Sequence, residues 1–261
     1  MVRIVLGIEY DGTDFVGWQS QATGRSVQDA LAVGVSAVAN ESITVNGSGR
    51  TDAGVHAAHQ VAHFDTTADR ECHQWVLGIN SNLPPDVTVL WAKEVPASFD
   101  ARRSAVSRHY RYVVLQRSTR PAVLRHRCWW LRELLDCSAM TMAATMWLGE
   151  NDFSAFRASG CQSSTPMRHL QSFGIYHRNS QVTLEFKANA FLQHMVRNLV
   201  GVLVKIGCGR AKPSWAKEVL VSLDRTEGGA TAPAHGLTLM GITYPREYQI
   251  PPSSMHEDRV C

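Results

Sequence analysis

The order of periodic segments in residues 1–100 constrains the fold more than any other feature of this 261-residue chain. Four segments carry the apolar patterns of strands, and they are 2–10, 43–49, 59–66 and 87–95. Two segments have helical signals: 26–40, with Ser26 as a candidate N-cap, and 71–82, which ends before Pro84. The order strand, helix, strand, strand, helix, strand is typical of the ferredoxin-like fold, an antiparallel sheet with helices on one face.

The remaining sequence repeats this pattern less regularly. Strands are predicted at 107–116, 127–132 and 236–244, a hairpin at 170–189, and helices at 137–149, at 192–208 and after Pro213. We therefore predict an α+β protein with an N-terminal domain over 1–104 and a C-terminal domain over 105–245. The polar, proline-containing segment 246–261 is predicted to be a loosely ordered tail.

Composition and short motifs exclude several classes of protein. No run approaches the ~20 apolar residues of a membrane span, and the N-terminus has the pattern of a strand rather than of a signal peptide. The six cysteines are scattered without a C-x-x-C pair, which favours reduced thiols. The chain has neither G-x-x-x-x-G-K nor G-x-G-x-x-G. These features predict a cytoplasmic protein with no membrane segment and no nucleotide cofactor.

The charge is distributed unevenly along the chain. Residues 1–100 carry 5 Lys and Arg against 12 Asp and Glu, whereas residues 101–261 carry 21 against 11. Residues 102–132 contain nine arginines and no acidic residue. Such a segment can be a solvated face, but its self-repulsion favours an anionic partner, and arginine matches phosphate well. Candidate phosphate contacts are Arg102, Arg103 and Arg108.

The predicted strand 107–116 combines basic and aromatic residues. Its period of two places Arg108, Tyr110 and Tyr112 on one face. These rings could stack on RNA bases beside a charged phosphate contact. Alternatively, the tyrosines belong to the core and direct their hydroxyls outward to a hydrogen-bond partner.

Two further features could carry chemistry. The stretch "GRTDAGVH" at 49–56 holds Asp52 on a glycine-flanked turn, which is also compatible with a simple Asx turn. Arg197 lies at the edge of the apolar arc of the predicted helix 192–208, where it either reaches solvent or needs an anionic partner. Three histidines precede or occupy the strand at 59–66, but their spacing fits no standard zinc signature, so no metal site is expected.

Six stretches of the chain together resemble the A family of tRNA pseudouridine synthases. They occur in order between about residues 3 and 245, and they are EYDGTDFVGWQ, GRTDAGVHA, RHYRY, GENDFSAFR, ANAFLQHMVRNLVG and TAPAHGLTL. This family isomerises uridines at positions 38, 39 and 40 in the anticodon stem-loop of tRNA. The resemblance implies two ferredoxin-like halves that resemble RNA-recognition domains, with their sheets joined into one and an active cleft between them. It also implies a homodimer and no cofactor.

The resemblance also implies a role for individual residues. Asp52 would be the catalytic aspartate, and Arg197 would pair with it across the two halves. Arg50 would help to flip the uridine, and Tyr110 would stack on the target base and assist the removal of its C5 proton. Leu237 would form an apolar wall of the base pocket.

Two other classes of function remain open from the residues themselves. A non-catalytic protein with two RNA-recognition-like domains would explain the arginines but would leave Asp52 and Arg197 without a role. A metal-dependent hydrolase would use His56, His59 and His63 as ligands.

Overall fold

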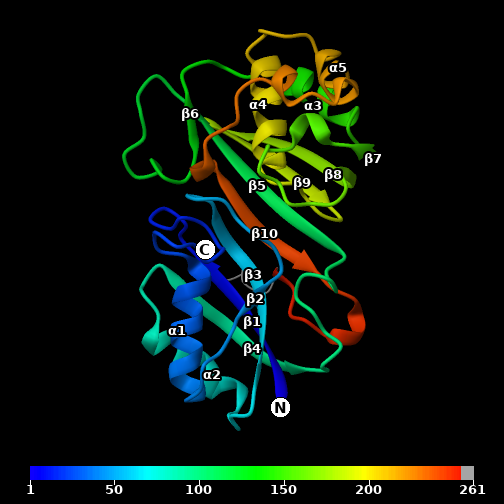
Figure 1. Ribbon diagram of the computed structural model, residues 1–261. Coiled ribbons are helices and arrows are strands. Elements are labelled where there is room, and N and C mark those ends of the chain that lie inside the picture. Colours follow the sequence, from blue (N-terminus) through cyan, green and yellow to red (C-terminus); the bar gives the residue numbers. More distant parts are fainter. Residues whose placement is uncertain (254–261) are drawn as a thin grey trace. The chain divides into compact units, whose positions relative to one another are not determined.

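The computed structural model describes residues 1–253, and the chain divides into two compact units (Figure 1). Unit 1 comprises Met1–Ser107 and the described residues from Leu239 onward, and unit 2 comprises Arg108–Thr238. The sequence predicts a second half over 105–245, whereas the described residues from Leu239 onward group with unit 1. The backbone N–H of Val106 donates to Thr243 O at 2.8 Å, which fastens this returning segment within unit 1.

Unit 1 has the predicted order of elements. They are β1 (Val2–Tyr10), α1 (Val27–Ala39), β2 (Asn46–Gly47), β3 (His56–Thr66), α2 (Cys72–Asn82) and β4 (Val87–Val95). Strand β1 lies between β4 and β3, strand β2 pairs with β3, and every one of these pairs is antiparallel. The register between β1 and β3 places Leu6 opposite Ala62. Both residues are fully buried in the core.

The two helices of unit 1 pack closely against each other. A methyl group added to Gly78 of α2 would lie 2.9 Å from the Val38 side chain of α1, so the absence of a side chain permits this approach. Helix α1 begins as predicted, because the Ser26 hydroxyl accepts from the Asp29 N–H at 3.0 Å. It ends at Asn40, which takes a left-handed conformation with φ 55°.

Unit 2 contains strands in the order β5-β9-β8-β7, and neighbouring strands in this order are antiparallel. Its elements are β5 (Ser107–Gln116), β6 (Trp129–Leu131), α3 (Cys137–Thr145), β7 (Gly149–Asp152), β8 (Met167–Arg178), β9 (Gln181–Ala188), α4 (Met195–Gly207) and α5 (Trp215–Ser222). The short strand β6 runs parallel to β5. The last strand, β10 (Leu237–Thr243), begins in unit 2 and continues in unit 1. The mainly antiparallel α+β class is thereby confirmed.

Some boundaries differ from the sequence prediction. Helix α3 ends at Thr145 rather than at residue 149, because Gly149 takes φ 88° and opens the unpredicted strand β7. The first part of the predicted loose tail makes defined contacts: the Tyr248 ring meets Phe99 edge-on at 5.0 Å, and Lys93 Nζ donates to Gln249 O at 2.9 Å. The remainder of that predicted tail, 254–261, lies outside the described residues.

Two findings concern the whole described chain. Within residues 1–253, none of the helices is both long and apolar enough to cross a membrane. The five cysteines in that range, Cys72, Cys128, Cys137, Cys161 and Cys208, are free thiols.

Candidate active site

The loop that carries Asp52 connects β2 to β3 and is fastened at its start to β3. The backbone N–H of Ser48 donates to Val61 O at 2.8 Å, and Gln60 Nε2 donates to Gly49 O at 2.9 Å. Gln60 is fully buried, so its amide orients the loop from inside unit 1. The first turn of the loop is therefore anchored before it reaches Arg50.

The centre of the loop is held by the segment that follows β1. The Tyr10 and Thr51 hydroxyls lie 2.8 Å apart, and the Trp18 N–H donates to Thr51 O at 3.0 Å. Burial raises the pKa of Tyr10 to about 12, so its hydroxyl keeps its proton at neutral pH and can donate it. Thr51 is buried, whereas its neighbour Asp52 is half-buried and Arg50 is exposed. The loop thus fixes one buried residue and presents a carboxylate and a guanidinium on either side of it.

Two glycines allow the segment after β1 to approach this loop. Gly17 forms a bridge with Asp52 and has φ 111°, and a methyl group added to it would lie 2.5 Å from Thr51 O. A methyl group on Gly12 would lie 2.0 Å from Val55 O. Sequence reasoning did not identify these glycines or Tyr10 as supports of Asp52. The only indication in the sequence was that their stretch, EYDGTDFVGWQ, resembles the same family as GRTDAGVHA does, although no chemical role was assigned to it.

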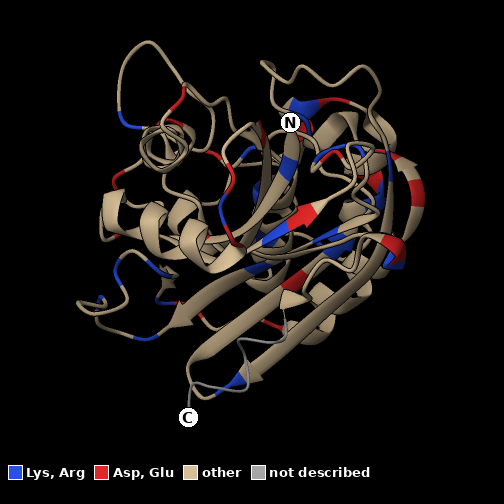
Figure 2. Cartoon of the chain, turned by 90° about the horizontal axis from the view of Figure 1, so that it is seen from below, with Lys and Arg blue, Asp and Glu red and all other residues tan. Residues whose placement is uncertain are grey.

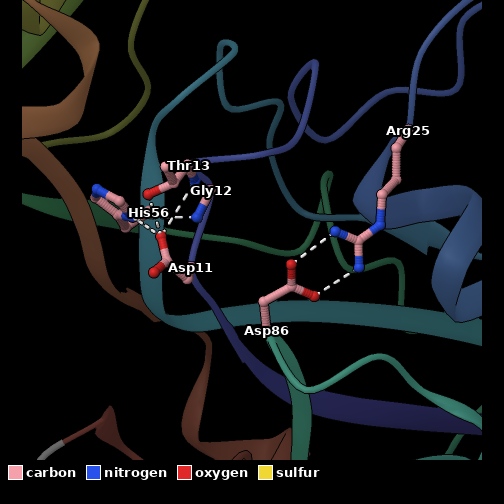
Figure 3. A network of polar contacts seen from close by, with 6 residues as sticks. All are labelled: Asp11, Gly12, Thr13, Arg25, His56 and Asp86. Carbon is pink, nitrogen blue, oxygen red and sulfur yellow. Dashed lines mark hydrogen bonds and ion pairs between the residues drawn. The ribbon is translucent and has the colours of Figure 1, made fainter. Parts of the chain in front are cut away.

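A polar network supports the other end of the loop (Figure 3). His56 is buried, and its Nδ1 lies 3.0 Å from both the Gly12 N–H and Asp11 Oδ1. These contacts require different states, because an unprotonated Nδ1 accepts from Gly12 and a protonated one donates to Asp11. We favour the unprotonated Nδ1, because the Gly12 N–H can only donate and Asp11 Oδ1 already accepts from the Thr13 hydroxyl at 2.6 Å.

A bidentate ion pair fastens the same region to the start of β4 (Figure 3). The Arg25 guanidinium donates to both oxygens of Asp86 at 2.7 Å, and the hydrogen bond to Asp86 raises the pKa of Arg25. The guanidinium also lies 4.1 Å from the centre of the Phe15 ring. Phe15 O in turn accepts from the Gly54 N–H at 3.3 Å, so this pair supports the loop of Asp52 indirectly.

The histidines considered as metal ligands have separate surroundings. His59 Nε2 accepts from the Trp91 indole N–H at 3.3 Å, and His63 Nδ1 accepts from the Ala101 N–H at 3.1 Å. Within residues 1–253, no group of three or more His, Cys, Asp or Glu side chains is arranged to hold a metal ion. These contacts assign His59 and His63 structural roles.

Unit 2 positions Arg197 on helix α4 against the segment that leads into β10. Arg197 Nε donates to Ala232 O at 2.8 Å, and the Ala232 N–H donates to Arg197 O at 3.1 Å. In the same segment, Pro233 O accepts from the Tyr112 hydroxyl at 2.8 Å. Tyr112 is fully buried, and burial raises its pKa, so the core interpretation of this residue is correct.

Tyr110 and Leu237 belong to the same unit. Tyr110 lies two residues before Tyr112 on β5, and its ring meets Phe191 edge-on with centroids 5.2 Å apart. Leu237 begins β10 directly after a 3-10 turn at Ala234–Gly236. Tyr110 retains 9% exposure and Leu237 5%, so each offers only a small apolar surface to a ligand.

A buried amide, which the sequence analysis did not identify, supports Arg197 from the neighbouring position. Asn198 Nδ2 donates to Phe156 O at 2.8 Å, and its Oδ1 accepts from Arg225 at 2.9 Å and from the Thr231 hydroxyl at 2.7 Å. It thereby joins the stretches GENDFSAFR, MVRNLVG and TAPAHGLTL around α4. The sequence could have indicated Asn198, because it is a single amide within the apolar arc of a helix and a buried amide needs hydrogen-bond partners.

The basic candidates fall on both sides of the unit boundary. Arg102 and Arg103 belong to unit 1, where their backbone N–H groups donate to Asp100 Oδ1 at 2.9 and 2.8 Å and their side chains are exposed. Arg108 belongs to unit 2 and donates to Asn189 O at 2.8 Å. Within the nine-arginine segment, Arg111 pairs with Glu185 at 2.9 Å, so this guanidinium has a carboxylate partner (charged residues are coloured in Figure 2).

The site residues therefore form two sets. Unit 1 contains Arg50 and Asp52 on one supported loop, and unit 2 contains Tyr110 on β5, Arg197 on α4 and Leu237 at the start of β10. The pairing of Asp52 with Arg197 stays a prediction. A half-buried carboxylate on a fixed turn can act as a nucleophile or as a base, and an exposed guanidinium beside it can bind a polyanion.

Comparison with known proteins identifies the class to which these two sets of residues belong. The model of the family described as tRNA pseudouridine synthase matches residues 7–102 and 143–245. The matched ranges include the loop of Asp52, helix α4 with Arg197, and the start of β10. They cover more than half of the chain.

Individual relatives agree with the family model along nearly the whole sequence. The chain is 50% identical over 251 residues to tRNA pseudouridine synthase A of Coxiella burnetii, covering 96% of each chain. It is 51% identical over 252 residues to the same-named protein of Alcanivorax borkumensis, covering 96% of this chain and 94% of that one. It is 49% identical over 255 residues to the Cronobacter sakazakii protein of that name, covering 98% of this chain and 94% of that one. The chain belongs to the tRNA pseudouridine synthase family, whose members are isomerases.

Proposed function

We propose that this protein converts uridine to pseudouridine at positions 38, 39 and 40 in the anticodon stem-loop of tRNA, with Asp52 as the catalytic carboxylate. The observation that carries the proposal is the Asp52 loop, which is fixed by Tyr10, Gly17 and Gln60 within a segment matched by the family model. Such fixation is what catalysis by an oriented carboxylate requires, whereas a protein that only binds RNA has no use for it.

The reaction is balanced without a redox or metal cofactor. The N1–C1′ bond of the uridine breaks, the uracil rotates, and a C5–C1′ bond forms. The proton leaves C5 and N1 gains one, so the product is an isomer of the substrate. Asp52 either attacks C1′ or removes a ribose proton to give a glycal, and both routes need the ionised carboxylate. An arginine partner keeps a carboxylate ionised in a site that excludes water, and this is the role proposed for Arg197.

The other candidate residues have roles in substrate handling. The uridine must leave the base stack, which costs a few kcal/mol, and Arg50 on the exposed side of the loop is suited to fill the space that it leaves. Tyr110 is proposed to stack on the flipped base and to assist loss of the C5 proton. Leu237 is proposed to form an apolar wall for the base, and Arg102, Arg103 and Arg108 to bind phosphates.

The proposal extends to architecture and assembly. The sheet of unit 1 has the order β4-β1-β3 with β2 on the far side of β3, and this order supports a ferredoxin-like half. We propose the same plan for unit 2, with the catalytic cleft between the halves. We further propose a cytoplasmic homodimer that binds one tRNA across both chains.

The direct test replaces Asp52 with asparagine, which keeps the shape and removes the ionised carboxylate. A tRNA transcript tritiated at uridine C5 should release tritium with the parent protein and none above background with Asp52→Asn. Binding of the transcript should be nearly unchanged, because affinity comes mostly from phosphates. The matched control is Asp69→Asn, an exposed aspartate of unit 1 outside the loop, which should behave as the parent. Tritium release by Asp52→Asn would refute the role assigned to this residue.

The site of modification is tested separately. Transcripts that retain a single uridine at position 38, 39 or 40 should each release tritium, and a transcript with all three positions replaced should release none. Tritium release from the transcript without uridine at these three positions would show that the modified uridine lies elsewhere in the tRNA. It would not contradict the isomerase activity.

A further inference from the structure

One loop of unit 2 is mostly exposed and strongly basic. It comprises residues 117–128, which connect β5 to the parallel strand β6 and are drawn in green beside β6 in Figure 1. Two neighbouring parallel strands cannot be joined by a tight turn, so the chain has to travel back before β6 begins. This basic loop contains Arg117, Arg120, Arg125 and Arg127 and no acidic residue. None of its residues is among the candidate site residues described above.

The first half of the basic loop is held by Arg117. Its Nε donates to Thr119 O at 2.8 Å and its Nη2 donates to Arg120 O at 2.9 Å, so one planar guanidinium caps two successive carbonyls. The backbone carbonyl of Arg117 accepts from the Trp130 indole N–H at 2.8 Å, and Pro121 is buried. Arg117 therefore fixes the backbone that carries Arg120.

The second half of the basic loop also has internal contacts. Arg125 Nη1 donates to Ala122 O at 3.2 Å, and the backbone N–H of Arg127 donates to Leu124 O at 2.9 Å. The buried Cys128 thiol donates to Leu124 O as well, at 3.2 Å. A loop that is held by this many internal contacts needs little further ordering when it binds a ligand.

Arg120 differs from Arg117 and Arg125 in the surroundings of its guanidinium. The side chain is exposed, and within residues 1–253 its guanidinium forms no hydrogen bond, ion pair or ring contact. By comparison, Arg111 pairs with Glu185 at 2.9 Å. A planar guanidinium matches phosphate with two parallel hydrogen bonds. Arg120 is thus a cation on a fixed backbone whose donors are available to an anion.

The end of the basic loop lies beside residues of the candidate site. The His235 imidazole hydrogen-bonds to the backbone of Cys128, and His235 is two residues before Leu237. Burial lowers the pKa of His235, and the nearby charges of His126 and Arg197 lower it further. The basic loop therefore ends close to the segment that is proposed to form the wall of the base pocket.

We propose that the basic loop binds the sugar–phosphate backbone of the RNA substrate, with Arg120 as a phosphate contact and Arg117 as the residue that positions it. The proposal rests on the proposed function in taking RNA as the ligand. A loop with charges of one sign favours a polyanion, because bound phosphates relieve the repulsion among its guanidinium groups. The same repulsion opposes a twofold contact between this loop and that of a second copy of the chain.

The first test compares two exposed arginines. Arg120→Gln removes the proposed contact, and the matched control Arg70→Gln removes an arginine that follows the end of β3, whereas the Asp52 loop precedes its start. The probe is a labelled tRNA transcript without uridine at positions 38, 39 and 40, and its dissociation constant is measured by fluorescence anisotropy at several salt concentrations. The slope of log affinity against log salt should fall in magnitude by about one for Arg120→Gln and should be unchanged for Arg70→Gln. At about 0.15 M salt, one lost contact corresponds to about fivefold weaker binding.

The second test is a double-mutant cycle for the positioning role. Arg117→Lys keeps a cation but loses the planar fork that caps the carbonyls of Thr119 and Arg120. It should weaken binding about threefold in the parent, because the loosened loop has to be ordered on binding, and leave the salt slope as in the parent. In Arg120→Gln it should have no further effect, since the contact that it positions is absent. If circular dichroism shows that Arg117→Lys does not fold, the comparison of Arg120→Gln with Arg70→Gln decides the contact alone.

Two results would overturn the inference. An unchanged salt slope in Arg120→Gln, or an equal change in Arg70→Gln, would show that the basic loop is only a solvated face. Additive losses from Arg117→Lys and Arg120→Gln would exclude the positioning role. Failure of the proposed function gives a different result: the parent would release no tritium from its substrate, while the difference in salt slope between the two glutamine variants would persist. Retained tritium release with equal slopes would refute the contact alone.

Discussion

Replacement of Gly17 by alanine should damage both stability and catalysis, although Gly17 touches no substrate in the proposed reaction. Gly17 is buried, has φ 111° and forms a bridge with Asp52. A methyl group there would lie 2.5 Å from Thr51 O and 3.1 Å from the carbonyl carbon of Asp52. Both partners are backbone atoms, so the overlap is relieved by displacing the backbone at Asp52, which carries the carboxylate proposed to be catalytic.

The expected magnitude follows from two separate effects. Overpacking of a buried site costs about 1–3 kcal/mol, and a side chain forced into a sparsely populated backbone conformation costs about 1–3 kcal/mol more. The sum, about 2–6 kcal/mol, is within the ~5–15 kcal/mol stability of a typical protein, so part of this range leaves Gly17→Ala folded. A displacement of Asp52 by about 1 Å is expected to lower the single-turnover rate by about 100-fold.

The matched control lies in the same loop. Gly49→Ala adds the same methyl group where no atom lies within 4 Å, so its stability should stay within about 0.5 kcal/mol of the parent. The free energy of unfolding is measured by chemical denaturation, and the rate by tritium release with excess enzyme. Parent-like stability and rate in Gly17→Ala, or equal damage in both variants, would refute the role assigned to this close approach.

Three further perturbations test other parts of the molecule. If Arg197 pairs with Asp52 as proposed, Arg197→Met should lower the single-turnover rate more than Arg197→Lys does and move the residual activity to higher pH; a parent-like pH profile would refute the pairing. Simultaneous neutralisation of Arg102, Arg103 and Arg108 should weaken tRNA binding. The slope of log affinity against log salt should fall in magnitude by about one per lost phosphate contact. Burial, and to a smaller extent the charge of Arg3, lowers the pKa of His63 below its ordinary 6.5. The unfolded chain therefore protonates at His63 at a higher pH than the folded chain does, and the free energy of unfolding falls as the pH drops below about 6.5. His63→Asn keeps an acceptor for the Ala101 N–H without titrating, and it should flatten that decline in thermal unfolding midpoints.

The long periodic segments were predictable from the sequence because their burial patterns extend over many residues. Strands β1 and β4 have the predicted bounds, and helix α2 begins one residue later than predicted. Strand β7, GEND, was not predicted, since a glycine and three polar residues have no recognisable hydrophobic period; they form a strand by pairing with β8. Helix α4 begins at Met195 rather than at residue 192, because His194 takes a left-handed conformation with φ 62°.

In the candidate site, too, some features follow from local sequence and others depend on contacts between distant segments. The loop position of Asp52 and the helical position of Arg197 follow from local sequence, since glycines flank one and an apolar arc borders the other. The supports do not follow from local sequence. The Tyr10 hydroxyl reaches Thr51 across 41 positions, and Asn198 reaches Phe156 across 42. Contacts over such separations leave no periodic trace in one sequence, so they become visible only in the folded chain.

The stretches that carry the family resemblance therefore supply mostly support rather than chemistry. A carboxylate on a loop has little rigidity of its own, and productive geometry requires placement within about 0.5 Å. In unit 1 this placement comes from Tyr10, Gly17 and Gln60, and in unit 2 Asn198 gives comparable support to the residue before it, Arg197. Substitutions among these supports should lower the rate while leaving affinity for tRNA almost unchanged, because phosphate contacts that supply affinity tolerate small displacements and an oriented carboxylate does not. A loss of affinity that parallels the loss of rate in such variants would mean that the supports position the RNA rather than the catalytic groups.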